Sequence, residues 1–237
     1  MNTVRKLLAS LAILLAACLV HAADSKPASR VMTTLDIETD DPTGYATWIA
    51  QYNEVAKAKL GIDPYLRVYQ SWFDGRGTTR LRVVAAAASV AELVKNNEVL
   101  ENDPAIVQIV GHMRPIRKLG ARVLYQAVYF DGPTPKGAST FTTQAVITDE
   151  AGYVKALAQL RTIFDAIGLK DAKIGGYRTL VGRTDHTHRI TISLPSAERL
   201  GVFLDLMASN QKVADWLASV ATIRTVVTNF SSREITR

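Results

Sequence analysis

The chain has 237 residues, of which 48% are hydrophobic and 21% are charged, as in an ordinary globular protein rather than a disordered one. Its 28 lysines and arginines exceed its 22 aspartates and glutamates by six, but the basic residues form no runs and the aromatic residues fall at core-like spacing. This mild excess excludes the strongly basic class of proteins, and we expect no nucleic-acid partner.

The first 22 residues have the layout of a secretory signal peptide. Arg5 and Lys6 form a positive start, an apolar run extends from residue 7 to residue 20, and small residues precede Ala23. The run is shorter than the roughly 20 residues that cross a bilayer, and no other stretch approaches that length. We therefore expect an exported protein, periplasmic or secreted, with no transmembrane segment and with no cysteine after cleavage.

A second cleavage site remains open. The sequence LAAC at residues 15–18 resembles a bacterial lipobox, in which Cys18 would become the lipidated N-terminus. Leu19 and Val20 after this cysteine are apolar, whereas exported lipoproteins usually turn polar there. Ordinary cleavage before Ala23 is therefore the first expectation, and a lipid anchor through Cys18 is the alternative.

Residues 29–131 have the pattern of a strand, a helix, two strands, a helical region and a last strand. SRVMTTLDIET alternates as a strand does, and Asp41 with its following proline then opens an amphipathic helix. YLRVYQSWF and TRLRVVAAA are two strands joined by the turn DGRG, after which Ser89 and Glu92 resemble a capping box. Asp103 and its proline restart the helix, and ARVLYQAVYF is the closing strand.

The same order of elements returns about 107 residues later. The pairs that coincide at this offset include Gly75 and Gly182, Arg82 and Arg189, Ser89 and Ser196, and Leu93 and Leu200. This shared order predicts a duplication, with one ferredoxin-like β-α-β-β-α-β unit over residues 29–131 and another over residues 139–237. The turn-rich segment 132–138 links them. Because helices cover one sheet face of each unit, we expect the other faces to pack sheet on sheet.

The order of elements resembles that of the dimeric α/β-barrel superfamily, which includes the antibiotic-biosynthesis monooxygenases, the stress-responsive barrel proteins and the NIPSNAP-like proteins. SVAELVKNNEVLENDPAIVQIV and SAERLGVFLDLMASNQKVADWL look like the short helix, asparagine-containing break and second helix of that group. The resemblance covers residues 29–237. It implies an α+β fold in which a tandem fusion forms one pseudo-dimeric barrel, with any pocket between the sheets or beneath the second helices.

Strand alternation places a set of polar side chains on the faces that we expect to line the barrel. These candidate ligand-binding residues are Arg82, Arg189, Tyr69, Arg67 and Arg178. A buried arginine must be paired or must bind an anion. Two interpretations stay open. Arg82 and Arg189 form structural pairs with acids such as Asp36 or Glu38, or they form a carboxylate- or phosphate-binding pair in a cavity with Tyr69 as a further donor.

His186 and His188 stand two positions apart, a spacing that two metal ligands can have. Alternation places both on the face opposite Arg189, beneath the helices and at the solvent-near end of the strand. Zinc requires at least a third protein ligand, Asp185 is too close in sequence to serve, and the chain shows no further cluster. We therefore expect no metal site, with His186 and His188 as weak candidates for one.

Other chemistries lack their motifs. The sequence after residue 22 contains no glycine-rich phosphate loop, no Gly-x-Ser-x-Gly elbow and no cysteine nucleophile. The acidic pairs at 40–41 and 149–150 stand at helix starts, where capping explains them. The haem-degrading branch of the superfamily relies on a spaced Asn, Trp and His set, and RVMTTLDIE lacks its first-strand asparagine although His112 is present. No cofactor is expected.

Three functions remain open. The missing motifs and the semi-polar inner face favour an exported barrel that binds a small molecule between its sheets, with an anion as one option. The alternative is a cofactor-independent monooxygenase-like barrel enzyme, in which tyrosines and a histidine handle protons. The third is a structural or interaction module of the cell envelope, for which the lipobox would be a hint. A cavity between the sheets would favour the first two over the third.

Overall fold

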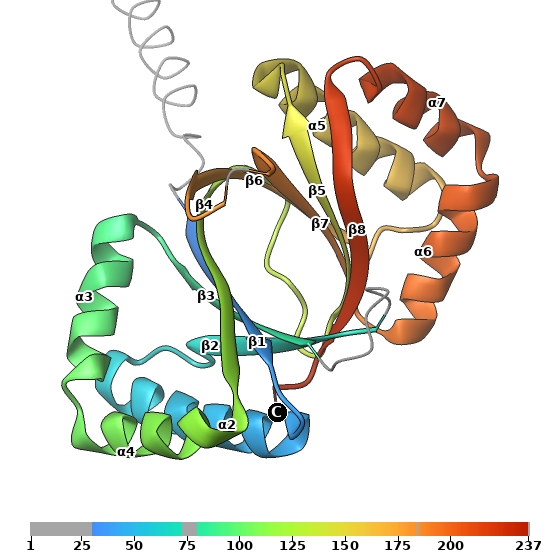
Figure 1. Ribbon diagram of the computed structural model, residues 1–237. Helices are drawn as coiled ribbons and strands as arrows, with labels where there is room; N and C mark the ends of the chain where they lie inside the picture. Colours follow the sequence, from blue (N-terminus) through green and yellow to red (C-terminus); the bar gives the residue numbers. More distant parts are fainter. Residues whose placement is uncertain (1–29, 73–79, 184, 237) are drawn as a thin grey trace, which may run out of the picture.

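The computed structural model describes residues 30–72, 80–183 and 185–236, which form a closed barrel with helices on two sides (Figure 1). The signal peptide, the lipidation candidate Cys18 and the predicted DGRG turn lie outside the described residues.

The two halves of the described chain have the same order of elements. The first half contains β1 (Val31–Glu38), α2 (Pro42–Leu60), β2 (Leu66–Ser71), β3 (Arg80–Ala87), α3 (Val90–Glu101), α4 (Pro104–Met113), the short 3-10 helix η1 (Arg114–Ile116) and β4 (Lys118–Phe130). The second half contains β5 (Ser139–Ile147), α5 (Glu150–Ala166), β6 (Lys173–Val181), β7 (His188–Leu194), α6 (Ala197–Ser209), α7 (Gln211–Val220) and β8 (Arg224–Glu234).

Side-chain caps determine where the helices begin, as the sequence predicts. Asp41 accepts a hydrogen bond of 2.7 Å from the backbone N–H of Gly44, just before the proline that opens α2. Ser89 accepts one of 3.1 Å from the N–H of Glu92. The Glu92 carboxylate reaches back to the N–H of Ala88 at 2.9 Å, one residue earlier than in the standard capping box. Aspartates also cap α4 and α5.

The eight strands of the described chain close into one antiparallel barrel in the order β1-β3-β2-β8-β5-β7-β6-β4. The sequence predicts two sheets packed face to face as one pseudo-dimeric barrel; the structure shows the barrel, and it also shows that strand pairing joins the two sheets at both edges. Tyr69 of β2 pairs with Glu234 of β8 at one seam, and Ala127 of β4 pairs with Tyr177 of β6 at the other. Closure removes free strand edges, and an eight-stranded barrel has room inside for side chains or for one small ligand.

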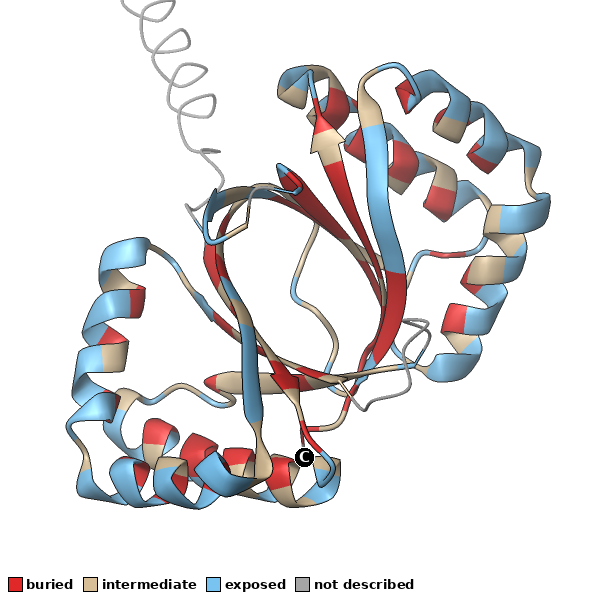
Figure 2. Ribbon diagram, in the orientation of Figure 1, coloured by how far each residue is buried: buried red, intermediate tan, exposed pale blue. Residues whose placement is uncertain are grey.

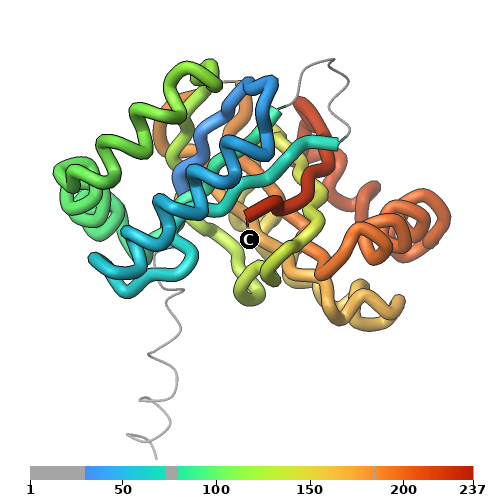
Figure 3. Tube along the Cα trace, turned by 90° about the horizontal axis from the view of Figure 1, so that it is seen from below, coloured from blue at the N-terminus to red at the C-terminus, as the bar shows by residue number. Residues whose placement is uncertain are grey.

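The helices cover the barrel in two groups. In Figures 1 and 3, α2, α3 and α4 lie on one side, and α5, α6 and α7 lie on the other. Figure 2 shows that the buried residues follow the strands and the helix faces turned toward them. Each group therefore has its own apolar layer against the sheet, one including Tyr45, Leu81 and Leu100, the other including Phe164 and Phe203. None of the described helices has the length and hydropathy to cross a membrane.

A segment without helix or strand, residues 131–138, runs across one end of the barrel and is called the crossing segment below. Its ends join β4 and β5, between which β6 and β7 intervene in the barrel. Arg67 of β2, from the opposite wall, donates a hydrogen bond of 3.1 Å to the carbonyl of Thr134. The N–H of Gly137 donates to Glu234 of β8 at 2.8 Å. These contacts hold the segment over the barrel mouth.

Candidate functional site

The barrel encloses two cavities, one toward each end. The first, of about 230 Å³, lies beneath the crossing segment and is called the Arg189 cavity. The second, of about 330 Å³, lies at the other end, where the charged side chains of Asp36, Arg82, Arg183 and Asp185 line it, and is called the polar cavity. The structure therefore provides interior space between the sheets, as a ligand-binding barrel requires.

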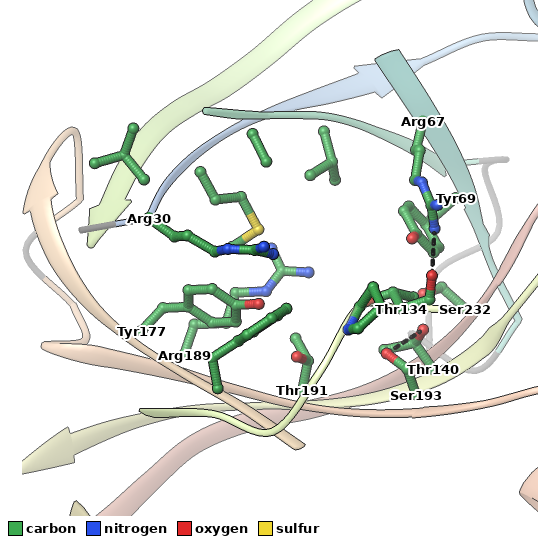
Figure 4. Close-up of a pocket in the computed structure, with 16 residues that line it drawn as sticks. Arg30, Arg67, Tyr69, Thr134, Thr140, Tyr177, Arg189, Thr191, Ser193 and Ser232 are labelled. Atoms are coloured by element: carbon green, nitrogen blue, oxygen red, sulfur yellow. Dashed lines mark hydrogen bonds between the residues drawn. The ribbon is translucent and has the colours of Figure 1, made fainter. Parts of the chain in front are cut away.

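The Arg189 cavity combines an apolar part with a polar part. The apolar side chains that line it belong to Val31, Met32, Val84, Ala86, Phe130 and Pro133. Its polar side chains belong to Arg30, Arg67, Tyr69, Thr134, Thr140, Tyr177, Arg189, Thr191, Ser193 and Ser232. In Figure 4, Arg30, Tyr177 and Arg189 lie along one side of the cavity, and Arg67, Tyr69 and the hydroxyl residues Thr140, Ser193 and Ser232 lie along the other.

Arg189 of β7 is a buried cation that forms no salt bridge within the described residues, and the acid that acts on its charge, Asp36, is already paired with Arg82. Its exposed fraction is 5%, and neither Nε nor Nη1 has a hydrogen-bond partner among the described residues. The rings of Tyr125 and Phe230 lie 5.9 Å from its Cζ and compensate the charge in part. Burial, and then the nearby charge of Arg82, lower the pKa of Arg189 to about 10. The group is therefore still protonated at neutral pH.

Arg82 of β3 faces the interior as well, but it has the acid partner that the sequence suggests. Its Nε donates to Asp36 Oδ1 of β1 at 2.7 Å, and its Cζ lies 4.4 Å from the centre of the Phe230 ring. Arg82 lines the polar cavity, whereas Arg189 lines the other one. Arg82 is thus paired with an acid, as one of the two interpretations from the sequence expects, whereas Arg189 has no salt bridge to an acid among the described residues.

Tyr69 and Arg67 of β2 also line the Arg189 cavity, on the side of the crossing segment. Burial raises the pKa of Tyr69 to about 12, so its phenol remains neutral. The Arg67 guanidinium lies 3.5 Å from a carboxylate oxygen of Glu234 in addition to its bonds to the crossing segment. Burial raises the pKa of Glu234 despite that neighbouring cation. Arg67 is thus mainly engaged in holding the barrel mouth.

Arg178 lies outside the barrel, contrary to the expectation from the sequence. It is exposed, and it donates to Glu150 at 3.1 Å and to Gln126 at 2.7 Å. The neighbouring Tyr177 is the residue of β6 that faces the cavity. In this strand the two halves match at an offset of 108 residues, which places Tyr177 on Tyr69, instead of the offset of 107 residues found in the sequence. A difference of one residue reverses the face of every side chain in a strand, so the sequence assigns Arg178 to the wrong face.

The two histidines turn to opposite sides, which corrects the expectation that they share a face. His188 donates from Nε2 to Glu150 Oε2 at 2.9 Å, on the helix side of the sheet, whereas His186 contacts the interior residue Tyr125. Their exposed fractions are 6% and 1%, so neither is solvent-near. Strand β7 begins at His188, and strand alternation therefore does not extend back to His186. In this arrangement the two imidazoles face different partners, Glu150 and Tyr125.

A hydrogen-bonded chain that sequence analysis missed runs through His186. Its Nδ1 donates to Asp185 Oδ1 at 2.9 Å, and its Nε2 lies 3.0 Å from the hydroxyl of Tyr125. A hydrogen bond from Arg183 lowers the pKa of Asp185 to about 2, and burial lowers the pKa of His186. The imidazole is therefore neutral and accepts the phenol proton of Tyr125 in a hydrogen bond. Tyr125 comes from β4, and no local sequence pattern connects it with His186.

No protein-family model and no curated protein matches the sequence. Solved structures do match. A candidate monooxygenase from Lactobacillus acidophilus has a TM-score of 0.59 at 7% identity, over 87% of this chain and 93% of its own. A chlorite dismutase variant from Candidatus Nitrospira defluvii has a TM-score of 0.52 at 10% identity, over 86% and 91%. An anthrone oxidase-like protein has a TM-score of 0.51 at 13% identity, over 89% and 92%.

The fold is that of the dimeric α/β-barrel proteins. The fold predicted from the order of elements is therefore confirmed. At such identities the likeness to these α/β-barrel proteins carries the architecture and not the reaction. The names of the three neighbours also differ, so the function has to be inferred from the side chains inside this barrel.

Proposed function

We propose that this α/β barrel binds a small anionic molecule in the Arg189 cavity. The observation that carries the proposal is the Arg189 guanidinium, which is buried, charged and without an acceptor in the described residues. An isolated buried charge is costly, and a bound anion would supply the missing hydrogen bonds and the missing charge at once. The hydroxyl of Thr191, on the same face of β7, offers a further donor to a ligand in the cavity.

Calorimetric titration with a panel of anions tests this proposal. The panel contains inorganic phosphate, sulfate, acetate and hexanoate, and the wild-type protein is compared with Arg189→Met. Arg178→Met is the matched control, because it removes an equally charged arginine from outside the barrel. We expect at least one anion to bind the wild type and the control but not Arg189→Met. Equal binding by all three proteins, or by none, would contradict the proposal.

A second candidate function is a monooxygenase-like barrel enzyme that needs no cofactor. The chain from Asp185 through His186 to Tyr125 favours it, because a neutral imidazole placed against a phenol can accept its proton. The Tyr125 ring also lies 5.9 Å from Arg189. Oxygen uptake in the presence of anthrone tests this candidate, since one neighbour is named for anthrone oxidation. Uptake that Tyr125→Phe abolishes would support an enzyme, and no uptake by the wild type would speak against it.

We also propose that the protein is exported, either to a periplasm or to the medium. The layout of residues 1–22 supports this, with two basic residues before an apolar run. Mass spectrometry of the exported protein should show Ala23 as the first residue. A diacylated Cys18 at the N-terminus would instead support the lipoprotein alternative and a membrane-anchored role in the cell envelope.

The two halves are proposed to be tandem ferredoxin-like repeats. The repeated order of elements over residues 31–130 and 139–234 supports this, as does a recurring contact. Burial raises the pKa of Tyr45 and of Tyr153. Each phenol has an arginine as its hydrogen-bond partner, Arg117 for Tyr45 and Arg224 for Tyr153. These tyrosines and arginines occupy matching positions of the two halves.

A further inference from the structure

We infer that the anion bound in the Arg189 cavity is a small monocarboxylate with an apolar body. This inference rests on the proposed function and specifies the chemical class of its ligand. Three features of the cavity determine the class: the number of unpaired charges, the distribution of apolar surface and the available volume.

The charge balance favours a single negative charge. Arg189 is the buried cation without an acceptor among the described cavity residues. Arg67 already faces Glu234 and the crossing segment, and Arg30 is exposed at the rim with its Cζ 4.4 Å from the Phe130 ring. Burial raises the pKa of Tyr177, so this phenol adds no charge. A carboxylate would neutralise Arg189, whereas a phosphate dianion would leave one negative charge buried.

The donors inside the barrel also suit a carboxylate better than a phosphate. Proteins that bind phosphate in their interior commonly offer several free backbone N–H groups at a helix N-terminus or in a glycine-rich loop. The walls of this cavity are strands, whose N–H groups are engaged in the barrel pairing. What remains is one guanidinium, which binds a carboxylate in a bidentate fork, and the hydroxyl of Thr191 on the same face of β7.

The rest of the cavity calls for an apolar body. Met32 and Val84 lie on the wall formed by β1 and β3, and Phe130 and Pro133 lie toward the crossing segment. A fully hydrated inorganic anion would leave this surface against water, whereas a short hydrocarbon chain or an aromatic ring would cover it. The ligand is thus expected to direct its carboxylate to Arg189 and its body to Phe130.

The volume limits the size of the ligand. The cavity measures about 230 Å³, which is below the roughly 300 Å³ at the lower end for drug-sized ligands. The crossing segment covers the mouth, since Pro133 and Thr134 are part of the lining. Short-chain and aromatic carboxylates fit this space, and long-chain fatty acids do not.

Titration calorimetry on the full mature chain distinguishes the classes with hexanoate, phenylacetate, acetate, 1-hexanol, hexyl phosphate and inorganic phosphate. We expect hexanoate or phenylacetate to bind at least about tenfold more tightly than acetate, because the apolar body of the ligand is buried. Both should also bind at least about tenfold more tightly than 1-hexanol, because the alcohol lacks the negative charge. Arg189→Met should lose this preference for hexanoate over hexanol, which is a readout that a change in stability alone does not move.

The outcomes separate this inference from the proposed function. If phosphate or hexyl phosphate binds more tightly than the carboxylates and Arg189→Met loses that binding, the anion site stands and the carboxylate class is wrong. If hexanol binds to the wild type as tightly as hexanoate, or if no probe binds, both the anion site and the carboxylate class are wrong. Val84→Phe is a second variant, which fills the apolar part and should weaken hexanoate more than acetate.

Discussion

Arg82 and Arg189 stand at matching places in β3 and β7, yet their surroundings are opposite. Arg82 has the Asp36 carboxylate 2.7 Å away, whereas Arg189 has two aromatic rings nearby and no salt bridge to an acid among the described residues. A paired interior cation stabilises the fold through its partner, whereas an unpaired one is held in place at a cost in solvation. Replacing each arginine should therefore change the free energy of unfolding by amounts that differ in sign or in size.

The first prediction concerns this pair. Arg82→Met leaves the Asp36 side chain, 29% exposed, without its partner, and the free energy of unfolding should fall by about 1–3 kcal/mol. Arg189→Met removes a desolvated charge and keeps most of the side-chain volume, so stability should be unchanged or higher. Urea unfolding of both variants measures the difference. A fall of about 3–5 kcal/mol for Arg189→Met would indicate a structural ion pair and would exclude a ligand role for this residue.

The second prediction concerns His186, whose pKa burial lowers below its ordinary value of 6.5. Because the pKa of His186 is lower in the folded state, the unfolded state takes up this proton first as the pH falls. The stability of the folded state is therefore greatest above the unfolded pKa and decreases as the pH falls toward the folded pKa. His186→Gln has no titrating ring. From about pH 7 to about pH 5, wild-type stability should therefore fall more steeply than that of the variant. Parallel curves in urea unfolding at several pH values would show that His186 is not responsible.

The interior arginines could be predicted from the sequence, but their chemical roles could not. Alternation along a regular strand gives the face of Arg82 and of Arg189 reliably. It gives the wrong face for His186, which precedes β7, and for Arg178, where the two halves slip by one residue. The contact of Tyr125 with His186 joins residues 61 positions apart and has no local signature.

Among the elements, the turn after β6 depends on one glycine. Gly182 has φ of +116°, and a Cβ built there would lie 2.2 Å from the carbonyl oxygen of Arg122 in β4. Both the backbone conformation and the close approach of the neighbouring strand therefore exclude a side chain. The glycine fixes the register of the strands at this end of the seam between β4 and β6.

The third prediction follows from that turn. Gly182→Ala should destabilise the protein by about 2–4 kcal/mol, because the cost of backbone strain and the cost of a steric clash with Arg122 are added together. The matched control is Gly61→Ala at the end of α2, where φ is +71° and a Cβ would meet nothing within 4 Å. That change should cost about 1 kcal/mol from strain alone. Equal losses for the two variants in urea unfolding would contradict the contact with β4.

The crossing segment is a second element whose position depends on few contacts. Arg67→Met removes the hydrogen bond to the Thr134 carbonyl and the cation beside Glu234, whose side chain is 1% exposed. The fourth prediction is a loss of about 1–3 kcal/mol in stability, together with faster proteolysis within residues 131–138. Arg178→Met provides the control, since it lies outside the barrel. Unchanged proteolysis in Arg67→Met would show that this arginine does not hold the mouth closed.

At the scale of the whole molecule, the sequence predicts the order of elements and the superfamily fold, but not how the barrel closes. Hydrophobic periodicity and caps are local signals, and they place each strand and helix well. The seams between β2 and β8 and between β4 and β6 join residues from different halves, such as Tyr69 with Glu234. No residue pattern within either half encodes these pairings, and the face-to-face packing expected from the sequence omitted them.

The seams determine what happens when the chain is divided. A half of the barrel, residues 23–131 or residues 138–237, keeps its helix layer but loses both seams, so two strand edges become free. It also exposes the interior wall, which carries Met32, Val84 and Tyr125 in the first half. Free edges and an exposed apolar sheet face both favour aggregation. Stability of each half therefore depends on contacts that only the other half supplies.

The fifth prediction is that neither half folds alone and that the two halves reassemble when mixed. Each half expressed by itself should be aggregated or should lack a cooperative unfolding transition in circular dichroism. An equimolar mixture, refolded together, should give a one-to-one complex by size-exclusion chromatography with light scattering, because both seams can then form between the chains. The complex should regain any anion binding that the intact protein shows, since Met32 and Arg189 come from different halves of the same cavity. A half that unfolds cooperatively as a monomer would show that the seams are dispensable, and the closed barrel would then be two independent units in contact.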